Sequence, residues 1–141
     1  MGTELSVTVG GLRGKMQLTG RGHTSFEIPI DYFPPLGEDQ GFTPLELFLL
    51  SLAACSGHTV QFLLGKMGKT VTDLEVSAVG DRRTEEHPTL FTKIALRIRL
   101  KGEQLDAPSV EKAIRMAEEK FCPVWAMLKN SVPVSWEYEI G

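Results

Sequence analysis

Two cysteines are the residues of this chain with the clearest capacity for chemistry. Cys55 lies in the middle of a long apolar segment, and Cys122 lies directly before Pro123, at the start of a short helical pattern. A zinc site needs three or four Cys or His ligands, and His58 stands at helical separation from Cys55. Two thiols without a third cysteine favour redox chemistry. Metal binding that includes His58, and burial of both cysteines as small apolar side chains, remain open alternatives.

Thiol chemistry requires a thiolate, so the surroundings of each cysteine decide its role. Cys122 lies at a predicted helix N-terminus, where the helix dipole and free N–H groups favour an anion. From this position we predict that Cys122 ionises more easily than Cys55. Cys55 lies in mid-helix among apolar neighbours, where desolvation raises a thiol pKa unless a cation is near. If Cys55 is the nucleophile, an arginine or lysine must approach it from elsewhere.

The composition limits the number of domains and the classes of function. At 141 residues the chain is predicted to form one domain, residues 1–141. The net charge is −3 and the basic residues are scattered, so no nucleic-acid partner is expected. The N-terminal residues lack a basic stretch followed by an apolar run, so we predict no signal peptide and a cytoplasmic protein. Disulfides in the cytoplasm are usually transient, catalytic or sensing.

The apolar segment around Cys55 has a strong helix start. Thr43 is a suitable cap, Pro44 suits the first helical position, and Glu46 completes a Thr-x-x-Glu capping box. A helix is therefore predicted over 43–65. It is close to the length of a membrane span, about 20 residues. Because it carries polar side chains and amphipathic elements follow it, no membrane partner is expected.

Patterns along the rest of the chain predict an α+β fold with an antiparallel sheet. The clearest strand is 90–100, where apolar side chains alternate with Lys93, Arg97 and Arg99. This alternation indicates a sheet with one face in water. Further strands are predicted over 5–9, 15–18, 25–30, 71–79 and 132–140, and further helices over 108–121 and 124–129.

Helix 43–65 is apolar on nearly every side, and such a helix must be buried nearly all round. A chain of this size has little core with which to cover it, and an exposed flank would leave an apolar patch that monomers rarely show. The small residues Ala53, Ala54 and Gly57 would let two copies approach closely. We therefore expect an obligate homodimer with two such helices at its centre, in which N-terminal strands of one subunit reach Cys55 of the other.

Three motifs give the chain a resemblance to a known family. They are Thr-Pro-x-Glu-Leu at 43–47 followed by Leu-Ala-Ala-Cys at 52–55, His-Pro-x-x-Phe-Thr-x-Ile at 87–94, and Glu-Lys-Phe-Cys-Pro-Val at 119–124. In this order the motifs resemble the OsmC/Ohr family of thiol peroxidases. The resemblance covers the chain from about residue 5 to its end. It is nearest to the short OsmC-like branch with the His-Pro and Phe-Thr motif.

The resemblance implies a fold, an activity and a set of partners. The fold would be an intertwined homodimer, with antiparallel sheets around two long central helices. Cys55 would attack the O–O bond of an organic hydroperoxide and become a sulfenic acid, and Cys122 would resolve it as a disulfide. No cofactor and no metal would take part. A dithiol, such as a lipoyl group on a protein, would reduce the disulfide, and the activity would serve oxidative stress defence.

The resemblance also implies an activating arginine and a supporting glutamate. A guanidinium stays charged and can pair with both a thiolate and a carboxylate. Arg13, in Gly-Gly-Leu-Arg-Gly, is the first candidate for the arginine, and Arg21 is the second. In the organic hydroperoxide resistance proteins the glutamate follows the proline directly, but Leu45 occupies that position here. Glu46, one residue later, is the candidate, and it is equally a capping-box partner of Thr43.

The departure at Leu45 motivates an alternative function. The chain would then be an OsmC-like dimer without efficient peroxidase activity, binding a small apolar molecule or acting as a thiol redox sensor. Thiol geometry separates the two hypotheses, since a disulfide needs Cα atoms within about 7 Å of each other.

Overall fold

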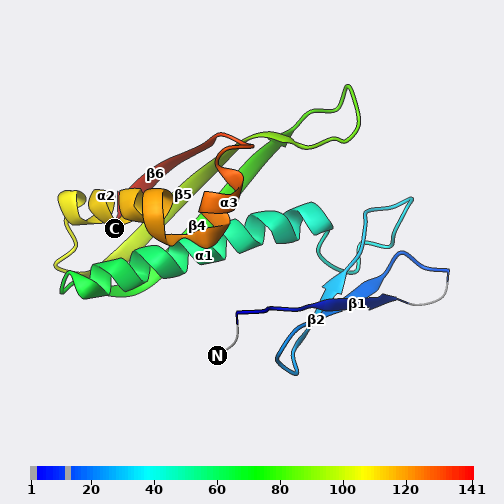
Figure 1. Ribbon diagram of the computed structural model, residues 1–141, viewed down its shortest axis with the longest axis horizontal. Helices are drawn as coiled ribbons and strands as arrows, with labels where there is room; N and C mark the ends of the chain where they lie inside the picture. Colours follow the sequence, from blue (N-terminus) through cyan, green and yellow to red (C-terminus); the bar gives the residue numbers. More distant parts are fainter. Residues whose placement is uncertain (1–2, 12–13) are drawn as a thin grey trace. The chain divides into compact units, whose positions relative to one another are not determined.

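The computed structural model describes residues 3–11 and 14–141 of the chain. Contacts divide the chain into two compact units, Met1–Phe48 and Leu49–Gly141, called unit 1 and unit 2 below. Each unit has its own three-stranded sheet. Helix α1, Pro44–Lys66, begins in unit 1 and runs on into unit 2, as Figure 1 shows.

The sheet of unit 1 is small and antiparallel. It contains β1 (Thr8–Gly11), β2 (Leu18–Arg21) and β3 (Glu27–Ile30) in that order. The first two strands begin three residues later than the sequence patterns at 5–9 and 15–18 predicted. The glycines of β1 pair with β2, although the sequence indicated a turn there.

The two faces of this sheet differ in character. Directly paired residues point to the same face of a sheet, so Val9, Gly20 and Ile28 share one face. The residues two positions along each strand lie on that face as well: Gly11, Leu18 and Ile30. This face is apolar, yet Val9 is 55% exposed and Ile28 is 45% exposed. Among the described residues of unit 1, Asp31 alone is fully buried. The described residues of unit 1 therefore form no buried apolar core in the single chain.

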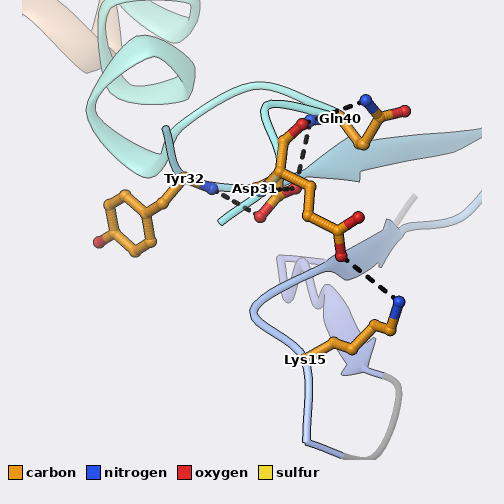
Figure 2. A network of polar contacts seen from close by, with 5 residues as sticks. Lys15, Asp31, Tyr32 and Gln40 are labelled. Atoms are coloured by element: carbon orange, nitrogen blue, oxygen red, sulfur yellow. Dashed lines mark hydrogen bonds and ion pairs between the residues drawn. The ribbon is translucent and has the colours of Figure 1, made fainter. Parts of the chain in front are cut away.

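A buried carboxylate organises the loop that follows β3. The Oδ1 atom of Asp31 accepts the backbone N–H of Tyr32 at 2.8 Å, and Oδ2 accepts those of Glu38 and Gln40, both at 3.1 Å (Figure 2). At Gly37 a Cβ atom would lie 2.3 Å from Oδ1 of Asp31, so only glycine fits there. The carboxylate thus closes the loop between β3 and α1 around itself.

Unit 2 has a larger sheet with one covered face. Strands β4 (Thr70–Arg82) and β5 (Phe91–Glu103) pair antiparallel over almost their whole length, and β6 (Val134–Ile140) completes the order β4-β5-β6. As predicted, β5 alternates between buried apolar and exposed charged side chains. The buried face is covered by the helices (Figure 1). On the other face Arg97 and Arg99 form ion pairs with glutamates of the neighbouring strands.

The prediction of a wholly antiparallel sheet is wrong for β6, which pairs with β5 in parallel. Between these strands the chain passes through α2 (Ala107–Met116), the π-helical turn η1 (Ala117–Phe121) and α3 (Pro123–Leu128). A helical crossover of a dozen or more residues returns the chain to the same end of the sheet, and parallel pairing follows from it.

Helix α1 is covered on one side in the single chain. Its buried residues form one stripe, whereas Leu50 is 47% exposed and Phe62 is 63% exposed. The single chain thus leaves one flank of α1 uncovered, as expected for one subunit, and the covering of that flank by a second copy stays a prediction. By length and composition α1 could span a membrane, but the core helix of a water-soluble protein has the same properties. The residues of the stripe are Leu52, Ala53, Ser56, Gly57, Val60, Leu63 and Leu64.

Candidate active site

The predicted start of the cysteine-bearing helix is confirmed. The backbone N–H of Thr43 donates to Oε1 of Glu46 at 2.8 Å, and the N–H of Glu46 donates to Oγ1 of Thr43 at 3.3 Å. The Thr43 hydroxyl donates to the same Oε1 at 3.1 Å. These reciprocal bonds form the capping box. Glu46 therefore has a structural role, and its catalytic role stays a prediction.

Cys55 lies at the margin of the buried stripe of α1 and is half-buried. The adjacent Ser56 is fully buried, and its hydroxyl donates to the carbonyl of Leu52 at 2.8 Å. On the far side of the stripe a Cβ atom on Gly57 would lie 3.1 Å from Cγ2 of Val76 in β4. Close packing of α1 on β4 thus fixes the helix, while the Cys55 side chain keeps partial access to solvent.

Cys122 lies at the junction between η1 and α3. Its backbone is extended, with φ −89° and ψ 106°, and its N–H donates to the carbonyl of Ala117 at 3.0 Å. This bond to the fifth preceding residue closes the π-helical turn. The Cys122 side chain is fully buried, so α2, η1 and α3 hold the second thiol in the interior of unit 2.

The prediction that Cys122 is the easier thiol to ionise is wrong. The pKa of Cys122 is raised to about 11, chiefly by burial and in smaller part by the neighbouring Cys55 side chain. The backbone N–H groups of Trp125 and Val124 act in the opposite direction. The helix N-terminus thus favours the anion as expected, but two N–H groups do not offset the loss of water.

The two thiols lie close enough to influence each other's ionisation, because the Cys55 side chain is one of the causes of the raised pKa of Cys122. Both cysteines are free thiols, and both belong to unit 2. One thiol is half-exposed and the other is held protonated behind it. Such an arrangement can take an oxidant at the outer sulfur and join the two sulfurs in a disulfide.

The candidate arginines have different positions in the chain. Arg13 lies outside the described residues. Arg21 ends β2 in unit 1, where its guanidinium lies 3.7 Å from the carboxylate of Glu27, and about half of its side chain is exposed.

The structure gives no geometric support to the metal alternative. Among residues 3–11 and 14–141, no group of three or more His, Cys, Asp or Glu side chains is placed to hold a metal ion. His58 is exposed on α1, on the flank away from the buried stripe.

An open apolar groove of about 240 Å³ lies between α1 and β4, where the buried stripe of α1 meets its exposed flank. Its polar lining comes chiefly from His58, whereas the other side chains are small or aliphatic. The groove is lined by Leu50, Ala53, Ala54, Gly57, His58, Leu74 and Val76.

Sequence reasoning missed the contacts that hold the segment before Cys122. The indole N–H of Trp136 in β6 donates to Oε1 of Glu118 at 3.2 Å, and Nζ of Lys129 donates to the Glu118 carbonyl at 3.2 Å. These residues are separated by up to 18 positions, and only the parallel crossover brings them together. The buried carboxylate of Asp31 was also missed, although an aspartate that begins a glycine-containing loop is a known turn signal.

Comparison with known proteins places these features in a family. The family model described as OsmC-like protein matches residues 37–137. A protein named YhfA from Escherichia coli strain K12 is 35% identical over 102 residues, which cover 72% of this chain and 75% of the relative. Peroxiredoxin OsmC from the same strain is 25% identical over 125 residues, covering 89% of this chain and 87% of the relative.

Solved structures with a similar fold are also found. A hypothetical protein from Aquifex aeolicus VF5 has a TM-score of 0.83 at 28% identity, covering 98% of this chain and 96% of its own. An OsmC-like protein from Mycoplasma pneumoniae has a TM-score of 0.85 at 20% identity, covering 99% of both chains. The second likeness bears on the fold alone.

Proposed function

This chain belongs to the OsmC-like protein family, and from that membership we propose that it is a cysteine-based peroxidase that reduces organic hydroperoxides. The observation that carries the proposal is the placement of Cys55 and Cys122 in one compact unit, near enough for the Cys55 side chain to raise the pKa of Cys122. The half-exposed position of one thiol and the full burial of the other support distinct roles for the two.

In the first step the Cys55 thiolate attacks the terminal oxygen of the hydroperoxide. The O–O bond breaks, Cys55 becomes a sulfenic acid, and the alkoxide leaves and takes a proton to become the alcohol. In the second step the Cys122 sulfur attacks the Cys55 sulfur. A disulfide forms, and the hydroxyl leaves as water with the proton from Cys122.

A dithiol reductant completes the cycle. It exchanges with the Cys55–Cys122 disulfide through a mixed disulfide, returns both thiols and becomes a disulfide itself. A protein-bound lipoyl group is a reductant of this class. We place the activity in the cytoplasm, where reducing thiol pools keep such cysteines free between turnovers.

The homodimer is part of this proposal, and two exposed apolar surfaces support it. The first is the uncovered sheet face of unit 1, which includes Val9 and Ile28. The second is the outer flank of α1, where the apolar groove next to Ala54 admits the close approach of a second helix. We propose that a second copy of the chain covers both surfaces and brings the activating arginine, Arg13 or Arg21, to Cys55.

The catalytic proposal is tested by replacing each cysteine. Cys55→Ser is expected to abolish consumption of an alkyl hydroperoxide such as tert-butyl hydroperoxide. Cys122→Ser is expected to leave one turnover per subunit, because the sulfenic acid forms but is not resolved. Steady-state peroxide consumption is followed with a dithiol present, and the single turnover of Cys122→Ser is measured on the reduced protein with no dithiol added. Unchanged steady-state turnover in Cys55→Ser would refute the proposal.

The assembly is tested by sedimentation at micromolar concentration, where a dimer is expected. Ile28→Asp places a charge on the apolar face of the unit 1 sheet and should shift the population to monomer. Thr19→Asp, on the opposite face of the same sheet, is the matched control and should leave the dimer intact. A stable folded monomer of the unmodified chain would contradict the dimer and the shared site.

One observation favours a second candidate function. Glu46, the candidate supporting acid, is held in the capping box, and Leu45 occupies the family position. A poorly activated Cys55 would suit a thiol redox sensor, which needs one oxidation and no rapid turnover. Stoichiometric oxidation of both thiols without multiple turnovers, with dithiol in excess, would favour the sensor.

A further inference from the structure

Glu118, in the turn that precedes Cys122, accepts two hydrogen bonds from other parts of unit 2. Its side-chain carboxylate accepts the indole N–H of Trp136, on β6, at 3.2 Å. Its backbone carbonyl accepts Nζ of Lys129, the residue that ends α3, at 3.2 Å. Glu118 therefore connects the π-helical turn to the sheet on one side and to the far end of α3 on the other.

Cys122 lies between these two attachments. The turn η1 leads directly into it, and α3 begins at the next residue. The π-helical bond from the Cys122 N–H to Ala117 is the last backbone bond of the turn. An inserted residue of this kind is often found at functional positions, because it re-aims the chain that follows. The orientation of Cys122 thus depends on where η1 is held.

We propose that Glu118 is a positioning residue, which holds the π-helical turn against Trp136 and thereby keeps the Cys122 sulfur within bonding reach of Cys55. The proposal rests on the two-cysteine function only in giving Cys122 the resolving role. Glu118 touches neither substrate nor the reacting sulfurs and acts through the backbone of η1.

A second aromatic–carboxylate bond on the same strand provides a matched control. The hydroxyl of Tyr138, two residues beyond Trp136 on β6, donates to Oε2 of Glu111 at 2.6 Å. Glu111 lies in α2, before the π-helical turn. Removing this bond takes one hydrogen bond from the same strand and the same helical crossover but leaves the attachment of η1 intact.

The test compares four variants in their folded state. Trp136→Phe and Glu118→Ala remove the attachment. Tyr138→Phe removes the control bond, and Glu118→Gln keeps an acceptor oxygen for Trp136. Circular dichroism establishes that each variant is folded. The first readout is the effective concentration of the Cys55–Cys122 thiol pair, obtained from its disulfide equilibrium with reduced and oxidised glutathione, which needs no peroxide.

Loss of the attachment should lower the effective concentration about tenfold, since a displacement of about 1 Å is costly to a reaction between held groups. Tyr138→Phe and Glu118→Gln should stay within about twofold of the unmodified chain. An unchanged effective concentration in both Trp136→Phe and Glu118→Ala would overturn the proposal. An equal loss in Tyr138→Phe would also overturn it, because the effect would then be one of general stability.

A second readout separates this inference from the proposed function. After addition of an organic hydroperoxide, the attachment variants should form the Cys55 sulfenic acid at the normal rate, measured with a sulfenic-acid trap, but should close the disulfide more slowly. If glutathione gives the expected losses and no protein consumes peroxide, the positioning role stands and the peroxidase proposal fails. If peroxide is consumed and all four variants close the disulfide at one rate, the positioning role fails.

Discussion

Asp31 in unit 1 and Cys122 in unit 2 are two acidic groups that the fold removes from water, with opposite consequences. Asp31 is 2% exposed and Cys122 is fully buried. Burial raises the pKa of both groups. At Asp31 three backbone N–H groups of its own loop, together with the Gln17 side chain, outweigh burial and hold the pKa below its ordinary value of 3.8. At Cys122 two N–H groups of α3 do not, and the pKa rises to about 11.

The contrast teaches how each unit uses a buried acid. In unit 1 the Asp31 carboxylate stays ionised, because the loop is folded around it. Little buried apolar surface is available there to stabilise the loop in its place. In unit 2 an apolar core holds the helices and strands together. A neutral thiol can be buried in that core without the desolvation penalty of a buried charge. The balance between burial and the surrounding hydrogen bonds sets the direction in which each pKa moves from its ordinary value.

The largest expected effect concerns the core that one unit has and the other lacks. Ile98 in β5 is fully buried, and Ile98→Ala should lower the free energy of unfolding by about 2–5 kcal/mol through lost burial and a cavity. Ile28→Ala, on the exposed face of unit 1, should act chiefly by weakening association of two copies. Urea unfolding and sedimentation measure the two effects. If Ile28→Ala lowers the free energy of unfolding as much as Ile98→Ala and leaves association unchanged, the difference between the two units is contradicted.

The next effect concerns the raised pKa of Cys122. If its thiolate closes the disulfide, the closing rate should rise about tenfold per pH unit and about hundredfold from pH 7 to pH 9, because the thiolate fraction rises in that proportion below the pKa of about 11. Burial, the largest cause of the shift, persists when Cys55 is oxidised. Stopped-flow measurement of disulfide closure after a pH jump tests this. A rate that begins to level off near pH 9 would show that Cys122 keeps its ordinary pKa of 9.0.

The smallest effect is local to the loop of unit 1. Asp31→Asn should speed amide hydrogen exchange at Tyr32, Glu38 and Gln40 by about tenfold or more, since bonds to a charged acceptor are stronger than bonds to a neutral one. Amides of unit 2 should be unaffected. Glu38→Gln is the control, because it removes only the exposed ion pair with Lys15 (Figure 2).

The same loop should respond to acid in the unmodified chain. The pKa of Asp31 lies below its ordinary value of 3.8, so its contribution to stability is complete above that pH and is lost as pH falls through the lowered pKa. Exchange at the three amides should therefore accelerate only in strong acid. Acceleration already near pH 5 would contradict a lowered pKa.

The difference between the two units also explains what the sequence could predict. Helix α1 and strand β5 were predicted closely, because the capping box of Thr43 and Glu46 and the alternation in β5 are local signals. The strands of unit 1 were predicted with shifted bounds. Their apolar face is not buried within the chain, so the hydrophobic pattern there specifies register weakly.

The parts of the candidate site that depend on topology were not predictable from local patterns. The pairing of the two cysteines came from the family resemblance, and their mutual influence depends on the packing within unit 2, which no local pattern records. The π-helical turn and its attachment through Glu118 and Trp136 require the parallel placement of β6. The ionisation of Cys122 was mispredicted because the helix N-terminus is visible in sequence, whereas the depth of burial is not.

The central claim, that Cys55 and Cys122 form one peroxide-reactive pair, is tested most directly by titration of free thiols. The fully reduced chain is treated with increasing tert-butyl hydroperoxide or hydrogen peroxide, and the remaining thiols are counted while mass spectrometry locates the bond. We predict that one equivalent of organic hydroperoxide removes both thiols of each chain as a Cys55–Cys122 disulfide, and that hydrogen peroxide is less effective. Retention of both thiols at excess organic hydroperoxide, or a disulfide only between chains, would contradict the account.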